Sequence, residues 1–479
     1  MKAKGTKLAQ ALTWLMLSLC GALLAAALLL GAEQKGERLT GVVLGVVVLA
    51  AAWYLLPRLS RLLASLGTAR AWAVLTLLCL LLKGAWVVLV RIPPAGDYAT
   101  YWGYANSLAQ SAVIDGGRYM ALFPHLFGYA AFLSWLIRLL GPSELLAQGL
   151  NVALTALSGS LLFLLGRRWW GLAGGSCAYL LWILCPSQTM YNALVLSEPL
   201  YTTLLLGAIA LLVLGEARGR RPVLLGAAAG GLLRLAQGVR PIALVVILAL
   251  LLWRLVLRPD TLRQGTSRRF WLPLMAALLA VYGLTGPMWN AHLARRIGEE
   301  PATTPGYSVL VGTNQASGGR WNQGDSDLLF SYSNQPGTTA QQAQEQALAA
   351  AVERLTAGET AVLPLLKEKL RVFLGSDDAC TGYCASVVRH TKLFARACNS
   401  FYYAALLLAG AGLIRLGRRR VDTAVLLLPL CVLGLTCAQA LVEVAGRYHY
   451  FLLPLLLLLG TGFLLSPGPG TAEKIQKSP

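Results

Sequence analysis

Long apolar runs alternate with short polar segments along almost the whole chain. A helix of about 20 apolar residues is long enough to cross the hydrocarbon core of a bilayer. Twelve runs approach or reach this length: Leu12–Leu30, Gly41–Leu56, Ala71–Val90, Leu146–Leu165, Leu172–Tyr191, Leu200–Leu214, Val223–Gln237, Ile242–Leu257, Leu272–Met288, Tyr402–Leu416, Thr423–Leu441 and Tyr450–Leu465. The pattern predicts an all-α polytopic membrane protein with about 12 transmembrane helices.

One further apolar run, Phe123–Leu140, is left out of this count. It is broken by Pro124 and Gly128 and carries Arg138. Counting it as a span would reverse the sidedness of every later loop. We therefore predict an interfacial helix on the outer leaflet, preceded by a second amphipathic segment, Tyr98–Val113.

A longer polar stretch separates the ninth and tenth predicted spans. It contains two predicted helices, Thr338–Thr356 and the basic Leu363–Leu374. At about 100 residues it is small for an independent domain, so we expect a cap over the outer face. The chain then divides into two N-terminal spans (1–70), a membrane core with an outer loop at 91–145 (71–290), an extracytoplasmic cap (291–400), and C-terminal spans with a cytoplasmic tail (401–479).

The composition supports this class of protein. Hydrophobic residues make up 56% of the sequence and charged residues 13%, with a mean hydropathy of +0.61. Soluble domains carry about 25% charged residues. The net charge of +20 could indicate nucleic acid, but the basic residues are scattered between apolar runs rather than gathered on one face. We predict contact with membrane lipids and no nucleic-acid partner.

The positions of Lys and Arg predict the orientation, because short cytoplasmic loops are rich in these residues. With the N-terminus inside, every arginine-rich short loop falls on the cytoplasmic side. These loops contain Arg58, Arg61, Arg70, Arg167, Arg168, Arg218, Arg220, Arg221, Arg258, Arg263, Arg268, Arg269, Arg415, Arg418, Arg419 and Arg420, and the tail contains Lys474 and Lys477. We therefore expect a multi-pass protein of the plasma membrane with both termini cytoplasmic. The first run follows three lysines but lacks a clear cleavage site, which favours an uncleaved anchor.

Three of the nine cysteines, Cys380, Cys384 and Cys398, lie in or beside the polar segment predicted to face outward. An oxidising compartment favours disulfides, so we expect one pair among the three. The sequence does not identify which two residues pair.

Four charged residues occur at the outer ends of predicted spans. Asp97 follows the third span, which must end at its two prolines, and Tyr98 is next to it. Glu198 begins the sixth span. Arg240 and Arg447 depart from the positive-inside bias in apolar surroundings, so they need an anionic partner. A phosphate fits this requirement, because a guanidinium binds it bidentately.

Each of these residues also has a purely structural interpretation. Asp97 could be a solvated loop acid, and Glu198 could stabilise the positive end of a helix dipole. The two arginines could form ion pairs with Glu198 and Glu443.

His125 and His449 are further candidates for substrate contacts, although interfacial histidines often serve only as hydrogen-bond partners. Asp325 and Asp327 resemble a metal-binding acid pair, but their Gly/Asn-rich surroundings favour a turn. No zinc spacing, phosphate loop or Ser/His/Asp signature occurs. We predict no metal site and no required cofactor, while a divalent metal stays compatible with the sequence.

The order of these motifs resembles the GT-C integral-membrane glycosyltransferases, and within them the protein-mannosyltransferase and aminoarabinose-transferase group, glycosyltransferase family 39. The matching stretches are Gly96-Asp-Tyr-Ala, Phe123-Pro-His-Leu-Phe-Gly-Tyr, Gly166-Arg-Arg-Trp-Trp-Gly, Leu196-Ser-Glu-Pro-Leu-Tyr, Val239-Arg-Pro and Gly446-Arg-Tyr-His-Tyr. The chain departs from the family in two ways. Many relatives carry Asp where Glu198 stands, and two extra spans precede the Asp97 loop here.

The resemblance implies a GT-C-like fold and a hexosyl or pentosyl transferase. Such an enzyme moves a sugar from a polyprenyl-phosphate donor to an extracytoplasmic acceptor, which could be a glycan, a lipid or a protein. It also implies that Asp97 is the catalytic acid and Glu198 the second lumenal acid. Independently, sugar transfer needs a base for the acceptor hydroxyl and cations for the departing phosphate, and Asp97, Arg240 and Arg447 can supply these. Two alternatives are a transporter or flippase of a lipid-linked saccharide, and a non-catalytic assembly or sensor protein.

Overall fold

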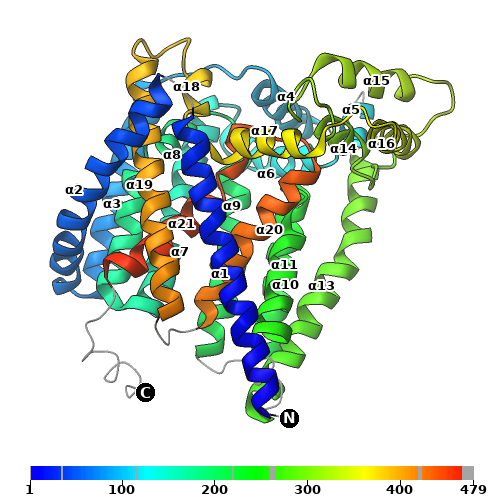
Figure 1. Ribbon diagram of the computed structural model, residues 1–479. Helices are drawn as coiled ribbons and strands as arrows, with labels where there is room; N and C mark the ends of the chain where they lie inside the picture. Colours follow the sequence, from blue (N-terminus) through cyan, green and yellow to red (C-terminus); the bar gives the residue numbers. More distant parts are fainter. Residues whose placement is uncertain are drawn as a thin grey trace.

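The computed structural model describes residues 2–33, 36–111, 113–114, 117–217, 221–258, 265–418 and 423–465. All regular elements in these ranges are helices, and no strand occurs among them (Figure 1). Several predicted inner-loop and tail residues lie outside the described residues: Arg218, Arg220, Arg263, Arg419, Arg420, Lys474 and Lys477.

Nine helices in the described part of the chain are long and apolar enough to cross a membrane. They lie within α1 (Lys2–Ala32), α2 (Glu37–Ser65), α3 (Thr68–Leu89), α7 (Glu144–Leu184), α9 (Glu198–Ala217), α10 (Pro222–Val239), α13 (Gly265–Ile297), α19 (Thr391–Arg418), and η2 (Thr423–Leu426) together with α20 (Leu427–Leu441). The predicted all-helical, multi-pass membrane fold is confirmed.

The predicted number of twelve spans corresponds to these helices as follows. Helix α7 contains two predicted spans, because its backbone leaves helical geometry at Trp170 and at Gly171, where φ is 74°. A positive φ is readily adopted by glycine. Shorter apolar helices make up the other two segments: α11 (Ala243–Leu251) with η1 (Leu252–Leu257), and α21 (Leu452–Leu464). Every predicted span is therefore helical, while the number of membrane crossings stays a prediction.

The predicted outer loop forms three helices, α4 (Asp97–Gln110), α5 (Arg118–Leu122) and α6 (His125–Leu140). They lie at the same end of the helix bundle as α14–α18, and the N-terminus of α1 lies at the opposite end (Figure 1). We call the end that carries α4–α6 and α14–α18 the cap end. The short α8 (Pro186–Tyr191) and the 3₁₀ turn η3 (Gly446–His449) also belong to this end.

The cap consists of α14 (Gly306–Gly312), α15 (Gln323–Ser333), α16 (Ala340–Thr356), α17 (Val362–Leu374) and α18 (Ala379–Tyr383). Helix α16 begins at Ala340, two residues after the predicted start at Thr338, because Thr339 and Gln342 form a capping box. The segment between α13 and α19 lies inside the predicted cap of 291–400, and the division of the chain into these domains stays a prediction. Helix α13 continues without a break to Ile297, and α19 already begins at Thr391, so the segment covers 298–390.

The prediction of a disulfide is wrong. All nine cysteines are free thiols, and the sulfur atoms of Cys380 and Cys398 are 3.8 Å apart, whereas a disulfide bond is about 2.05 Å long. Both sulfurs contact Sδ of Met190, at 3.7 and 3.9 Å. The two cysteines therefore pack as buried apolar groups, a role in which cysteine resembles a small hydrophobe.

Candidate functional site

Four charged residues from distant parts of the sequence meet at the cap end. Asp97 is the first residue of α4, Glu198 is the first residue of α9, Arg240 follows α10 directly, and Arg447 lies in η3. Each residue stands where the chain enters or leaves a helix, and this explains why the groups converge. Gly96, with φ of 55°, turns the chain into α4 after the two prolines.

Glu198 lies at the centre of this cluster, with a side chain that is 3% exposed. Its Oε1 accepts a hydrogen bond from Nη2 of Arg240 at 2.5 Å and lies 3.5 Å from Nε of Arg447. Its Oε2 accepts a hydrogen bond from the Ser197 hydroxyl at 3.4 Å. One buried carboxylate thus neutralises part of the charge of two guanidinium groups.

Asp97 forms an ion pair with Nη2 of Arg447. Unlike Glu198, its side chain is 58% exposed. The two acids therefore have different surroundings. Glu198 is enclosed between cations, whereas Asp97 remains open to a molecule that approaches from the cap end.

Tyrosine side chains surround the two arginines. Nη1 of Arg447 donates hydrogen bonds to the hydroxyls of Tyr98 and Tyr383, each at 3.3 Å. The Arg240 guanidinium lies over the ring of Tyr448, 4.7 Å from its centroid. Guanidinium groups are attracted to the faces of aromatic rings. The aromatic groups therefore help to hold both arginines in place.

The charges and burial of the cluster fix its protonation. Burial alone would lower the pKa of Arg240, but the Glu198 carboxylate more than offsets this and holds the pKa above its ordinary value. Burial likewise acts to lower the pKa of Arg447, and the surrounding tyrosines and Glu198 raise it well above the usual range. Burial raises the pKa of the Tyr98 phenol, which keeps it neutral.

Two donors in the cluster have no hydrogen-bond acceptor among the described residues. These are the buried Nε atoms of Arg240 and Arg447. A buried donor left without a partner costs free energy. Nε of Arg240 can therefore still donate a hydrogen bond to an added acceptor, and so can Nε of Arg447, which has only the 3.5 Å ion-pair contact with Glu198.

The two candidate histidines have different positions. Burial, together with the charge of Arg240, lowers the pKa of His125 to about 4, so a neutral imidazole stands near the cluster. His449 lies away from the cluster, where its ring contacts Asp377 and the backbone of Phe373. Sequence reasoning placed His449 with the substrate-binding residues, and its contacts in the structure are instead with buried protein groups.

Two further residues lie in this neighbourhood, and the sequence did not indicate one of them, Tyr383. Tyr383 reaches Arg447 from α18, and Glu443 accepts a hydrogen bond from the Tyr448 hydroxyl at 3.1 Å. Burial raises the pKa of Glu443. Glu443 had been considered only as an ion-pair partner of an arginine. The position of Tyr383 depends on how the cap packs, for which the sequence carries no local signal.

No group of three or more His, Cys, Asp or Glu side chains suited to a metal ion occurs among the described residues. Asp325, one of the two acids that resembled a metal-binding pair, is held by Arg354, Asn314 and Asn322. Asp327 accepts a hydrogen bond from Gln323. Both acids lie in the first turns of helix α15 (Gln323–Ser333), which Asn322 caps, so the start of a helix stands where the sequence favoured a turn.

No known protein family and no curated protein matches the chain. Among solved structures, it is similar to ArnT from Cupriavidus metallidurans bound to undecaprenyl phosphate, with 15% identity and a TM-score of 0.36. The apo state of the same protein gives 14% identity and a TM-score of 0.30. Each comparison covers 86% of this chain and 81% of that one. The backbones therefore agree only distantly.

Proposed function

We propose that the protein is a membrane glycosyltransferase of the GT-C type. It moves a hexosyl or pentosyl group from a polyprenyl-phosphate donor to an extracytoplasmic acceptor, a glycan, a lipid or a protein. One observation carries this proposal. An exposed carboxylate, that of Asp97, lies beside two buried guanidinium groups at the end of a membrane helix bundle.

The reaction needs one base and one site for the leaving group. Asp97 takes the proton of the acceptor hydroxyl while the hydroxyl oxygen forms a bond to the anomeric carbon of the sugar. The bond between that carbon and the phosphate oxygen breaks, and the phosphate departs with the electron pair. A positioned general base contributes about 10²–10⁴-fold to the rate of such a step.

Arg240 and Arg447 hold the departing phosphate in this proposal. Two preorganised cations in a site with little water stabilise the developing negative charge more strongly than water would. Nε of Arg240 has no hydrogen-bond acceptor among the described residues, and Nε of Arg447 has only its 3.5 Å ion-pair contact with Glu198. In this proposal both atoms donate to phosphate oxygens while the hydrogen bond between Arg240 and Glu198 stays in place. The chain is thus able to bind the leaving group without a metal ion.

Glu198 has a different role from Asp97. It is enclosed by the two arginines, and its Oε1 contacts both. We assign it the task of keeping two like charges close together and oriented. The sequence had grouped Glu198 with the catalytic residues, and the geometry favours a positioning residue.

The test is sugar transfer by the purified protein. A panel of radiolabelled polyprenyl-phosphate hexoses and pentoses is incubated with a delipidated cell-envelope fraction as acceptor, and release of polyprenyl phosphate is measured. We expect Asp97→Asn to slow release at least about 100-fold, because the amide keeps the size of the side chain but removes the base. Glu198→Gln should cost less than this.

Asp327→Asn is the matched control, because this exposed cap acid contacts only Gln323 among the interactions described and lies outside the cluster. It should release polyprenyl phosphate at the wild-type rate. Near-normal turnover in Asp97→Asn would refute the catalytic assignment. Movement of intact donor across vesicles, without release of polyprenyl phosphate, would instead support a transporter.

A further inference from the structure

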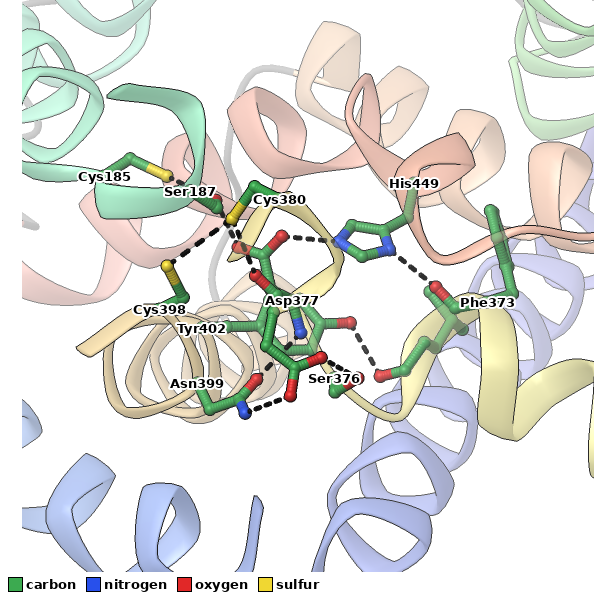
Figure 2. A network of polar contacts seen from close by, with 12 residues as sticks. Cys185, Ser187, Phe373, Ser376, Asp377, Cys380, Cys398, Asn399, Tyr402 and His449 are labelled. Carbon is green, nitrogen blue, oxygen red and sulfur yellow. Dashed lines mark hydrogen bonds and ion pairs between the residues drawn. The ribbon is translucent and has the colours of Figure 1, made fainter. Parts of the chain in front are cut away.

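A second polar network lies behind the Arg447 turn, buried where α8, α17, α18, α19 and η3 meet (Figure 2). Its centre is the pair His449 and Asp377, and each residue is 1% exposed. Nε2 of His449 lies 3.0 Å from Oδ1 of Asp377, and Nδ1 lies 2.7 Å from the carbonyl oxygen of Phe373.

The contacts fix the proton on one ring nitrogen. A carbonyl oxygen can only accept, so Nδ1 of His449 must carry a hydrogen. The hydrogen bond at Nε2 then requires one more proton, held either by the imidazole or by the carboxyl group of Asp377. In both cases the ring is held in one orientation, since the two nitrogens have different partners.

The remaining groups of Asp377 are also occupied. The Ser187 hydroxyl donates a hydrogen bond to Oδ2, and the backbone N–H of Asp377 donates to Oδ1 of Asn399 at 2.9 Å. The ring of Tyr402 stacks on the imidazole, with an interplanar angle of 27° and centroids 5.3 Å apart. Three separate segments therefore hold the carboxylate and the imidazole in place.

Burial of such a network is costly, because ionisable groups lose their hydration. Burial accordingly raises the pKa of Asp377, although the hydrogen bond from His449 acts in the opposite direction. The cost is offset only when every polar group has a partner, and in this network each does. Because many contacts act at once, a network of this kind fixes the position of the backbone segments to which its side chains are attached.

That backbone is the turn with Arg447. His449 and Arg447 are two residues apart in a 3₁₀ turn, where each residue rotates the side chain by about 120°. Their side chains therefore point in different directions: Arg447 contacts Asp97 and Glu198, and His449 contacts Asp377. The extended segment before the turn is held as well, because the backbone N–H of Glu443 donates a hydrogen bond to the carbonyl oxygen of Ser308 at 2.7 Å.

We propose that Asp377 is a positioning residue for the phosphate-binding site: through His449 it fixes the η3 turn, so that Arg447 presents its guanidinium group to a lipid phosphate. This inference rests on the proposed function of Arg447. It adds Asp377, which no sequence motif indicated, and it gives His449 an indirect role.

The experiment measures two quantities in purified protein. One is the binding of undecaprenyl phosphate, by titration in detergent micelles. The other is hydrogen exchange in peptides that cover residues 442–451, which reports on the turn whether or not the protein binds the lipid. The variants are Asp377→Ala, Asp377→Asn, Arg447→Ala and the combination of Asp377→Ala with Arg447→Ala.

Asp378→Asn is the matched control. Asp378 is the neighbouring acid and accepts hydrogen bonds from Ser376 and Asn399, but it does not contact His449. This variant should leave both exchange in 442–451 and lipid affinity within about twofold of wild type.

We expect Asp377→Ala to increase exchange in 442–451 and to weaken lipid binding about tenfold, the size of a lost hydrogen bond to a charged group. Asp377→Asn should largely retain both properties, because an amide can donate to Nε2 of neutral His449 and accept from Ser187. The double variant should bind no more weakly than Arg447→Ala, since both changes remove the same contact.

The outcomes separate the inference from the proposed function. If Arg447→Ala weakens lipid binding while Asp377→Ala does not, the positioning role is wrong and the phosphate role stands. Unchanged binding in Arg447→Ala would contradict the phosphate role itself. An equal loss in Asp377→Asn and Asp377→Ala would show that the charge matters rather than the geometry, and would overturn the inference. If Asp377→Ala is not recovered folded, His449→Phe replaces it, because phenylalanine keeps the stacking on Tyr402 but loses both ring contacts.

Discussion

Two guanidinium groups, those of Arg240 and Arg447, share one carboxylate at the cap end of the bundle. Oε1 of Glu198 lies within 3.5 Å of both arginines. One negative charge does not balance two positive ones, and the exposed Asp97 supplies the second. In the proposed function, an acceptor at Asp97 and a phosphate at the arginines would therefore act on the same ion-pair network, and this would couple the two substrates.

Replacement of Arg240 and Arg447 tests their proposed contact with the phosphate of the donor. Arg240→Ala and Arg447→Ala should each weaken undecaprenyl phosphate binding about tenfold or more, because each removes a charge-assisted donor. Lysine should restore only part of the affinity, since a point charge cannot reproduce the planar fork. The readout is lipid titration of the purified variants.

Arg320→Ala serves as the control for charge loss, because Arg320 is exposed on the cap and donates to Ser317 O. It should bind the lipid as wild type does. Wild-type affinity in both Arg240→Ala and Arg447→Ala would mean that the arginines serve only as structural partners of Glu198.

The thiols give a second prediction at the residue scale. Burial raises the pKa of Cys380 well above its ordinary value and that of Cys384 to about 12. Since the thiolate is the reactive form, neither should react with N-ethylmaleimide at pH 7.5 in folded protein. Cys437 is the exposed cysteine, but it lies in the apolar helix α20, where a membrane also disfavours the thiolate, so it too should react slowly. Mass spectrometry of unreduced peptides checks this, and a cross-linked Cys380–Cys398 peptide would contradict it.

Several site residues could be predicted from the sequence for a simple reason. Asp97, Glu198, Arg240 and Arg447 all occur where a span ends on the same side, so the topology alone brings them to one end of the bundle. His449 could not be placed in this way, because two residues in a 3₁₀ turn point in different directions. Tyr383 and Asp377 come from the cap, whose packing depends on tertiary contacts that no local pattern encodes.

At the scale of elements, helix α10 determines where Arg240 lies. Gly226 and Gly230 face α13 so closely that an added Cβ would lie 2.1 Å from the carbonyl oxygen of Leu274 and 2.5 Å from that of Leu278. Small residues four apart allow two membrane helices to approach in this way. Because Arg240 caps the end of α10, the fit between α10 and α13 also sets the position of the cluster.

Gly230→Ala should therefore destabilise the protein. The added methyl group meets backbone rather than a movable side chain, and overpacking of this kind costs about 1–3 kcal/mol. The control is Gly231→Ala, which has the same change in helix propensity but nothing within 4 Å of the added atom. Thermal unfolding in detergent should show a lower midpoint for Gly230→Ala alone. Equal midpoints for the two variants would contradict close packing of α10 on α13.

The limits of sequence-based prediction at this scale have a physical origin. The apolar pattern predicted the helical segments, and nine helices among the described residues have the length that the bilayer core requires. The segment between α13 and α19 is shorter than the predicted cap of 291–400, since both helices continue beyond their apolar parts, to Ile297 and from Thr391. Helical hydrogen bonding does not stop where the hydrophobic pattern does.

For the whole molecule, the remaining prediction is its orientation. Helix α13 has 33 residues, a length of about 50 Å, which exceeds the hydrocarbon core of about 30 Å. Arg269 is close to its first residue, and the cap follows its last residue. If α13 crosses the membrane, these two ends lie on opposite sides, and the positive-inside bias places Arg269 in the cytoplasm.

Single cysteines introduced on either side of α13 test this orientation in a Cys437→Ser background, since the other cysteines are buried. Ser331→Cys reports on the cap, because Ser331 is exposed, whereas Ser326, also in α15, is buried. In intact cells, a membrane-impermeant maleimide should label Ser331→Cys and should label Arg269→Cys only after lysis. The reverse pattern would place the site of Asp97 on the cytoplasmic side. The acceptor would then have to be a cytoplasmic molecule, and the proposal of an extracytoplasmic transferase would fail.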